Sequence, residues 1–231
     1  KGSAVKDLNL RFLADWRYAT KEEVDLSPVL DIDDEKSTDA NIGMQIVSSG
    51  PNLSDRYEIK LAYLKMIQKA KKYIYIQSPY LIIDNEMMTA LTYAAKRGID
   101  IKIILPSKPD KLPGKGDHPF VYWVNLVNAG DLLDFGVKIY HYDKNAFLHA
   151  KTVVIDDEIC SIGTANMDTR SFELNFEVNA FIYSEIIAKE QKGEFEKDIL
   201  KCEELTLEKY KNRSRGVKVK EAISRLFSDV L

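Results

Sequence analysis

The sequence predicts an α/β layered domain, because amphipathic helical segments alternate with short apolar segments typical of buried strands as far as Tyr142. After Tyr142 this alternation gives way to three strand-like segments that lie close together in the sequence. The chain has 231 residues, of which 45% are hydrophobic and 30% are charged. That size and composition suit one large globular domain, or one domain with appendages.

Hydrophobic spacing and capping residues place the individual elements. Apolar residues recur at helical spacing in 5–18, and the acidic, turn-rich stretch 21–43 is expected to be a linker. Asn85 and Gly98 are residue types that begin and end a helix. Strands are expected at 44–51, 73–80, 99–106, 137–142, 147–156, 158–165 and 174–184. Helices are expected at 55–72, 85–98, 118–136, 185–211 and 217–231.

The bulk composition argues against several classes of function. A formal net charge of −3 gives no global basic field, so no nucleic-acid partner is expected. Cys160 lies in an apolar run and Cys202 in a charged one, which favours a reducing compartment over a disulfide framework. The sequence contains neither a signal peptide nor an apolar run of about 18 residues, so this chain is expected to be soluble. Acids and bases are interspersed in the C-terminal helices, which predicts a solvated face rather than a membrane surface.

The candidate chemistry is concentrated in FLHAKTVVIDDEICSIGTANMDTR, residues 147–170. Side chains alternate with period two on a strand, so His149 and Lys151 are expected to project together from one face. Asp156 is expected at the end of the same strand, with the opposite parity. An imidazole and an ammonium group would thus stand side by side on a rigid support.

A second polar pair follows in the next strand. Thr164 and Asn166 are two residues apart and come after Gly163. Glycine permits a sharp turn of the backbone or the close approach of a ligand. A hydroxyl and an amide are therefore expected beside the histidine and the lysine.

The third strand adds a carboxylate, Glu177. Its alternation predicts one polar face, consisting of Asn175, Glu177 and Asn179. The other face is expected to point into the core and consists of Phe176, Val178, Ala180 and Ile182. Three neighbouring strands can therefore bring five polar groups together.

Such a set of groups suits a phosphate ester. Lysine and asparagine can bind the non-bridging oxygens, a neutral imidazole can attack phosphorus, and a carboxylate can fix the imidazole tautomer. This chemistry needs no metal or other cofactor, and the sequence has no cluster of metal ligands. The alternative, for His149 taken alone, is a histidine at a strand edge beside a surface lysine.

The string HAKTVVID followed by GTAN resembles the H-x-K-x4-D-x6-G-[ST]-x-N signature of the phospholipase D superfamily. Segments 44–51, 77–106, 136–142 and 166–179 also resemble the second catalytic half of bacterial cardiolipin synthases. The resemblance covers nearly the whole chain and is weakest in 25–40. It implies the phospholipase D-like layered fold, a mixed β-sheet flanked by helices on both faces, with a single H-x-K-x4-D motif.

The resemblance also implies roles for individual residues. In this superfamily two motifs meet at a pseudo-twofold cleft, where one histidine forms a phosphohistidine and the other acts as acid and base. His149 would be one of that pair, and Lys151 and Asn166 would bind phosphate oxygens. Thr164 takes the small-hydroxyl position. Two carboxylates complete the set: Asp156 as a supporting residue, and Glu177 as the residue that orients the histidine of the other half.

The chain departs from the family pattern because it contains one motif instead of two. Neither His118 nor His141 begins an H-x-K. We therefore expect a C-terminal half that is inactive alone. Residues 1–42 would be a helix and linker carried over from the preceding half, and 43–231 the phospholipase D-like domain. The missing N-terminal half, or a second copy of the chain, would complete the site. Membrane-spanning segments outside this chain would hold the full-length protein in the bacterial cell membrane, with this half on the cytoplasmic side.

The function that the resemblance implies is phosphatidyl transfer between two phosphatidylglycerol molecules, giving cardiolipin and glycerol. One alternative is a phosphodiesterase, either a lipid-cleaving phospholipase D or a homodimeric nuclease with one motif per chain. An alternative of another class is a catalytically silent assembly module. The complete set of polar motif residues argues against that last alternative.

Overall fold

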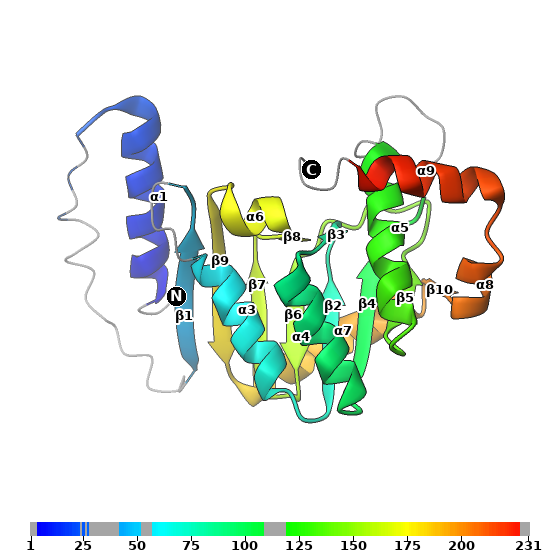
Figure 1. The fold of residues 1–231 in the computed structure, drawn as a ribbon. Coiled ribbons are helices and arrows are strands. Elements are labelled where there is room, and N and C mark those ends of the chain that lie inside the picture. The colour runs from blue at the N-terminus through cyan, green and yellow to red at the C-terminus, as the bar shows by residue number, and fades with distance from the viewer. Residues whose placement is uncertain are drawn as a thin grey trace.

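A mixed sheet of eight strands forms the centre of the structure, a computed structural model that describes residues 4–23, 25, 27, 42–51, 57–108 and 119–226. The order of the strands is β1-β9-β7-β6-β2-β4-β5-β10 (Figure 1). Their bounds are Gly43–Ser49 (β1), Tyr73–Gln77 (β2), Asp100–Leu105 (β4), Lys138–His141 (β5), Thr152–Ile155 (β6), Ile159–Gly163 (β7), Glu177–Tyr183 (β9) and Glu203–Leu205 (β10). Two short strands, β3 (Leu81–Ile82) and β8 (Met167–Asp168), pair separately in parallel.

The sheet has parallel strands at its centre and antiparallel pairs on both sides, since the edge strand β10 pairs antiparallel with β5. Strands β2, β4 and β5 run parallel, as expected where helices connect successive strands. Strands β6, β7, β9 and β1 then continue from β2 as an antiparallel array. This confirms the prediction of a mixed sheet.

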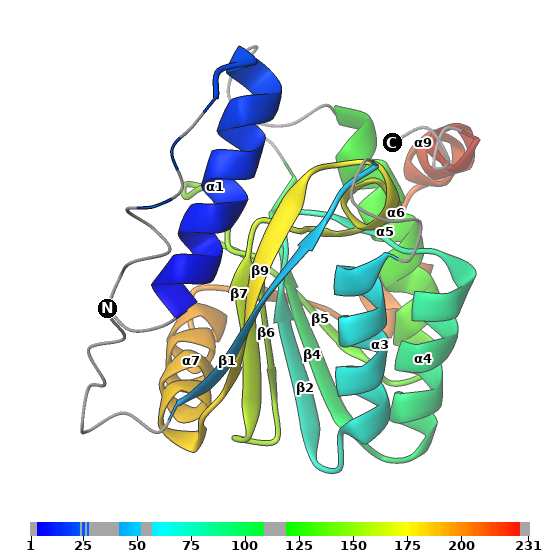
Figure 2. The same cartoon turned by 90° about the vertical axis from the view of Figure 1, so that its left-hand side faces the viewer.

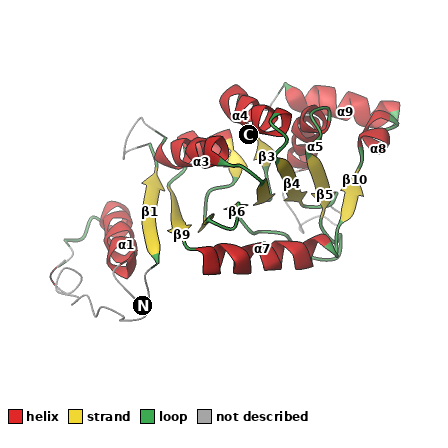
Figure 3. Cartoon of the chain, turned by 90° about the horizontal axis from the view of Figure 1, so that it is seen from below, coloured by secondary structure: helices red, strands yellow, loops and turns green. Residues whose placement is uncertain are grey.

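Helices cover both faces of the sheet, which confirms the layered α/β prediction. Helices α3, α4 and α5 lie on one face and α7 on the other, while α1 lies along the edge strand β1 (Figures 2 and 3). The helices are α1 (Ala4–Thr20), α3 (Glu58–Lys69), α4 (Asn85–Lys96), α5 (Pro119–Leu133), α6 (Thr169–Glu173), α7 (Glu185–Ile199), α8 (Leu207–Lys211) and α9 (Arg215–Arg225).

Each face of the sheet has its own hydrophobic core. The larger core lies under α3, α4 and α5, and the smaller one lies under α7. Alternation along β6 divides the strand between them, because Val153 and Ile155 belong to the first core and Val154 to the second. Leu148 and Ala150 pack with Val154, so the parity expected for 147–156 is confirmed.

Several predicted elements differ from the observed ones. The strand expected at 147–156 begins only at Thr152, and the helix expected at 185–211 is interrupted by β10. The cap of α4 is Asp84, whose carboxylate accepts a hydrogen bond from the backbone N–H of Met87 at 2.8 Å. Most of the expected linker 21–43 lies outside the described residues.

The register of the strands gathers the motif at one end of the sheet. Thr152 of β6 is opposite Gln77, the last residue of β2, so β6 begins where the parallel strands finish. In the same way β7 ends and β9 begins at this end, with Gly163 opposite Asn179. We call this end the carboxyl edge: the end of the sheet where β2, β4, β5 and β7 terminate and β6 and β9 start. Open α/β sheets bind ligands at the corresponding edge.

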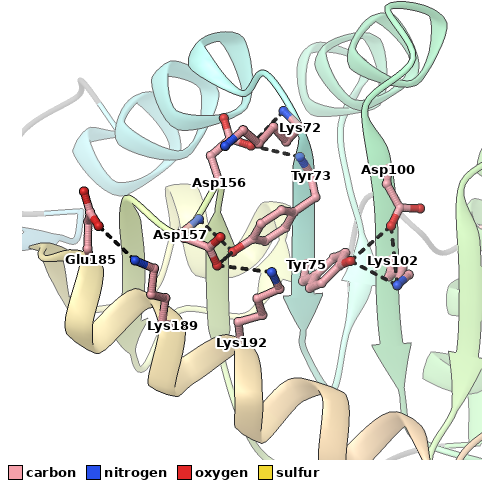
Figure 4. Close-up of polar contacts among 10 residues, drawn as sticks. All are labelled: Lys72, Tyr73, Tyr75, Asp100, Lys102, Asp156, Asp157, Glu185, Lys189 and Lys192. Atoms are coloured by element: carbon pink, nitrogen blue, oxygen red, sulfur yellow. Dashed lines mark hydrogen bonds and ion pairs between the residues drawn. The ribbon is translucent and has the colours of Figure 1, made fainter.

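The opposite edge of the sheet is held by the carboxylate of Asp156. This side chain is buried and accepts hydrogen bonds from the backbone N–H groups of Lys71 at 2.6 Å, Lys72 at 2.8 Å and Tyr73 at 2.9 Å. Figure 4 shows the bonds from Lys72 and Tyr73. The backbone of Asp156 is in the left-handed region, with φ of 59°. Asp156 therefore joins the β6–β7 turn to the start of β2.

Removing this carboxylate is expected to destabilise the fold. Asp156→Ala leaves three backbone donors without their acceptor, which should lower the free energy of unfolding by about 3 kcal/mol, given typical values for charged hydrogen bonds. Asp156→Asn tolerates the left-handed backbone and should lose less. Urea denaturation followed by circular dichroism measures both changes.

Glu158→Ala is the matched control, because Glu158 is the exposed residue of the same turn. Its free energy of unfolding should stay within about 0.5 kcal/mol of the parent. Equal losses for Asp156→Ala and Glu158→Ala would contradict the anchoring role.

Candidate active site at the carboxyl edge

His149 and Lys151 lie in the segment that leads into β6. The imidazole of His149 is exposed and stacks on the ring of Phe147, with centroids 5.3 Å apart and an interplanar angle of 20°. The Nζ of Lys151 donates to the carbonyl oxygen of His149 at 2.9 Å. The carbonyl of Lys151 accepts from the N–H of Gly163 at 3.3 Å, which extends the β6–β7 pairing by one residue. The pair is thus fixed to the sheet through its backbone.

The beginning of β6 is also fixed by polar side chains on the α7 face. The hydroxyl of Thr152 donates to the Oε1 of Gln77 at 3.1 Å, and the Nε2 of Gln77 donates to Asp198 of α7 at 2.8 Å. Gln77 is buried, and such a chain restricts its rotamer. These contacts hold the residue after Lys151 in place.

Thr164 follows β7 and is bound to the backbone of β9. Its hydroxyl oxygen accepts from the N–H of Val178 at 2.9 Å, and its own N–H donates to the carbonyl of Val178 at 3.0 Å. The sequence predicted a substrate-binding hydroxyl at this position. The structure shows a hydroxyl at the carboxyl edge that joins two strands.

Asn166 lies between β7 and β8. Its N–H donates to the hydroxyl of Ser171 at 3.2 Å, a buried side chain of α6. The Oδ1 of Asn166 is buried and has no hydrogen-bond partner among the described residues. Buried polar atoms nearly always have a partner, so this oxygen is suited to accept a hydrogen bond from a bound ligand.

Glu177 is the first residue of β9 and is half-buried. Its Oε1 accepts from the Nδ2 of Asn175 at 3.2 Å. Burial raises the pKa of Asp168, the cap of α6, and the negative charge of Glu177 raises it further. Two carboxylates therefore lie near each other at this edge, beside Asn166.

Asn179 is a residue of the site's support that sequence reasoning placed incorrectly. It was expected to share a polar face with Glu177, yet it is fully buried. Its Oδ1 accepts from the N–H of Ala165 at 3.1 Å, and its Nδ2 donates to the hydroxyls of Tyr63 at 2.7 Å and Ser161 at 3.1 Å. Asn179 thus holds the turn after β7 from inside the core.

The groups that closely approach Gly163 belong to the protein and not to a ligand. A Cβ on Gly163 would lie 2.3 Å from the Cγ of Asn179 and 2.5 Å from the carbonyl oxygen of Val178. Phe176, expected in the core, is 45% exposed, whereas Ile182 is 5% exposed. The two faces of β9 are therefore not divided into polar and apolar as the sequence suggested.

The structure thus places five of the six predicted site residues at the carboxyl edge: His149, Lys151, Thr164, Asn166 and Glu177. Asp156 is separated from them by the whole length of β6, which is 4 residues. At about 3.3 Å per residue, that strand alone spans more than about 10 Å, so Asp156 is out of contact with His149. Its carboxylate supports the sheet.

The chain has two other histidines, His118 and His141. His141 ends β5, and burial lowers its pKa. His118 lies outside the described residues. In the part of the chain that the structure describes, no group of three or more His, Cys, Asp and Glu side chains is arranged to hold a metal ion. Within the same ranges, none of the helices is both long enough and apolar enough to span a bilayer.

A mixed sheet with helices on both faces, carrying one H-x-K pair at its carboxyl edge, defines one half of a phospholipase D-type fold. Residues 63–199 match the family described as "Cardiolipin synthase, PLD-like domain". The chain belongs to this family.

Curated relatives support the same assignment over the whole chain. Cardiolipin synthase of Staphylococcus aureus strain Mu50 is 51% identical over 235 residues, covering 100% of this chain and 44% of the relative. Cardiolipin synthase 1 of Staphylococcus aureus strain COL is 47% identical over 231 residues, covering 100% of this chain and 45% of the relative. The chain therefore spans about half the length of the curated relatives it matches.

Solved structures show the same fold at low sequence identity. A phospholipase D family member, Nuc from Salmonella typhimurium, aligns with a TM-score of 0.56 and 20% identity, over 71% of this chain and 99% of Nuc. Phosphatidylserine synthase from Haemophilus influenzae aligns with a TM-score of 0.62 and 15% identity, over 82% of this chain and 46% of that protein.

Gly163→Ala is expected to destabilise the support of the site. The added methyl group overlaps the side chain of Asn179 and the carbonyl of Val178, and overpacking of this kind costs about 1–3 kcal/mol. Gly193→Ala in α7 is the control, because apart from its chain neighbours and the backbone of its own helix no atom lies within 4 Å of the new Cβ. It should stabilise the helix by about 0.5–1 kcal/mol. Thermal unfolding of the two variants should therefore shift in opposite directions.

Tyr63 predicts a pH dependence of stability. Burial raises the pKa of its hydroxyl to about 12, above the ordinary value of about 10. Above pH 10 the unfolded chain loses this proton before the folded chain does, so the contribution of Tyr63 is present below pH 10 and is lost as the pH rises towards 12.

The difference in free energy of unfolding between the parent and Tyr63→Phe should therefore shrink by about 1 kcal/mol from pH 9 to pH 11. Urea titrations of both proteins at each pH measure it. A difference that stays constant over this range would contradict the assignment.

Proposed function

We propose that this chain supplies one of the two catalytic motifs of a phosphatidyltransferase that converts two phosphatidylglycerol molecules into cardiolipin and glycerol. The observation that carries the proposal is the H-x-K pair at the carboxyl edge of a chain that belongs to the cardiolipin synthase family. Relatives that carry the name cardiolipin synthase match over the entire chain and support the choice of substrate.

The proposed reaction has two displacements at one phosphorus atom. In the first, an imidazole nitrogen of one motif histidine attacks the phosphorus of phosphatidylglycerol, and the bond to the glycerol oxygen breaks. The second histidine donates a proton to that oxygen, and glycerol leaves. The second displacement reverses these steps: the terminal hydroxyl of another phosphatidylglycerol gives its proton to the second histidine and attacks the phosphohistidine. His149 is one member of this pair.

The neighbouring groups have electrostatic and positioning roles in this proposal. The ammonium group of Lys151 moves from the carbonyl of His149 to the non-bridging oxygens, which carry the developing charge. Asn166 binds the same phosphate through its amide, and its unpartnered Oδ1 accepts from a hydroxyl of the substrate. Glu177 fixes the tautomer of the histidine in the other half. Asp156 takes no part in bond making, since it is committed to backbone donors.

A complete site requires a second motif. Because the chain covers 44% of its relative's length, the remaining part of a longer protein is the proposed source. A second copy of this chain is the alternative source. That longer protein is proposed to act at the bacterial cell membrane on its cytoplasmic side. At 20% identity the likeness to Nuc supports the fold alone. It is therefore no argument for a nuclease activity of this chain.

A chimera tests the proposal. This chain replaces the matching 44% of the Staphylococcus aureus cardiolipin synthase, to which it is 51% identical. The chimera should form cardiolipin and release glycerol from phosphatidylglycerol vesicles, whereas this chain alone should be inactive. His149→Gln should reduce turnover by at least about 10³-fold, as expected when a nucleophile or its proton donor is removed. His141→Gln is the control and should retain activity.

Other products would change the assignment. Release of phosphatidate instead of cardiolipin would indicate a phospholipase D that transfers to water. Cleavage of single-stranded DNA by this chain alone, in a dimer and dependent on His149, would indicate the nuclease. Activity of the chimera that survives His149→Gln would exclude His149 from the chemistry.

A further inference from the structure

Helix α9 has an exposed apolar stripe where a solvated helix would have polar residues. Val219 is 56% exposed, Ile223 47% and Leu226, its C-cap, 80%. These positions follow the i, i+4, i+7 spacing of one helix face. The buried residues of α9, Glu221 and Ser224, lie on the opposite side and face the rest of the protein. The stripe therefore points outwards.

Basic residues border this stripe on both sides. At about 100° per residue, Lys218 and Arg225 fall on one flank of the stripe and Lys220 on the other. All three are exposed, and so is Arg215 at the start of the helix. Arg225 is also 3.9 Å from Asp131 of α5, an ion pair in which both side chains are largely exposed.

The single acidic residue of α9 does not offset this charge at the surface. Glu221 is 4% exposed and is bound on both oxygens by the Nε of Arg213, at 2.7 and 2.8 Å. The sequence predicted a solvated face because acids and bases are interspersed. In the structure the acid is buried and paired, so the outward face of α9 carries only positive charge and apolar side chains.

Contacts at Trp123 place α9 beside the carboxyl edge. The Nζ of Lys220 lies 5.1 Å from the centroid of the Trp123 ring, and the Nζ of Lys108 lies 5.5 Å from the same ring. Lys108 comes three residues after Leu105, the last residue of β4. Figure 1 shows α9 at the end of the molecule where α6 lies, and Figure 2 agrees. The basic, apolar face and the motif therefore belong to one end of the protein.

We infer that α9 is an interfacial helix, which inserts Val219, Ile223 and Leu226 into the headgroup region of an anionic bilayer while its basic residues bind lipid phosphates. An apolar stripe between basic flanks is the pattern of helices that lie in the plane of a membrane. Nucleic acid would contact the lysines but leave the central aliphatic stripe in water. The inference that α9 binds a lipid surface depends only on the exposed residues of α9. The inference that this binding serves catalysis rests on the proposed function.

Vesicle binding of this chain tests the inference without requiring turnover. The probes are vesicles of phosphatidylglycerol and phosphatidylcholine in equal amounts, and vesicles of phosphatidylcholine alone, in low salt. Co-sedimentation should show strong binding to the first and weak binding to the second. The double variant Lys218→Gln, Lys220→Gln should bind the anionic vesicles about 30-fold less, at roughly 5-fold per lysine. Raised salt should weaken the parent more than this variant.

The apolar stripe has its own variant and a matched control. Replacing Val219, Ile223 and Leu226 with serine should reduce binding by at least about 10-fold, because their apolar area no longer leaves water. The control replaces two aliphatic side chains of the α7 region with serine, Ile186 at 71% exposure and Leu200 at 86%. It should bind like the parent. Exposed positions of this kind change stability little.

Three outcomes would overturn the inference. The chain could fail to bind anionic vesicles, or the α7 control could lose as much binding as the α9 triple variant. Lysine-dependent binding to an oligonucleotide without vesicle binding would make α9 a nucleic-acid surface instead. If the parent chain binds anionic vesicles but the unmutated chimera forms no cardiolipin, the proposed function is rejected and the membrane inference stands.

Discussion

The antiparallel pairing of β6 with β2 is the contact on which the arrangement of the motif depends. The parallel strands β2, β4 and β5 all end at the carboxyl edge, and reversal at β6 makes the next strand begin there. His149 and Lys151, which precede β6, are therefore placed at the edge where α/β sheets bind ligands. Had β6 been parallel to β2, the same residues would lie at the opposite edge, beside the start of β2. Strands β7 and β9 continue the reversal and add Asn166 and Glu177 to the edge.

The support below the motif is polar and internally satisfied. Asn179 joins the turn after β7 to Tyr63 of α3 and to Ser161 of β7, and these three side chains are all buried. A buried network of this kind is costly if one partner is missing, because the remaining groups are left without water. It therefore specifies one conformation of the turn that carries Thr164 and Asn166. Gly163 is required because no other residue leaves room for Asn179.

Much of the fold and of the site could be predicted from the sequence, and the failures have physical reasons. Periodic segments such as α3 and α4 were placed well, since their apolar spacing is clear. Asn179 was misplaced because both faces of this sheet are covered, so alternation separates one core from another and not core from water. The short elements α6 and β10 leave too few residues to show a period. Sequence alone also could not show that Glu221 is buried, which is a matter of tertiary packing.

The spacing between Lys151 and Asp156 in the motif corresponds to the length of β6. The residues between Lys151 and Asp156 are the strand itself, Thr152–Ile155, so the four intervening positions measure the depth of the sheet from one edge to the other. Adding or deleting one residue there would exchange the two faces of the strand and shift one end by about 3.3 Å. Either the imidazole would leave its edge or the carboxylate would leave its three backbone donors. The four-residue spacing is therefore set by the length of β6, and it does not depend on which phosphate ester is bound.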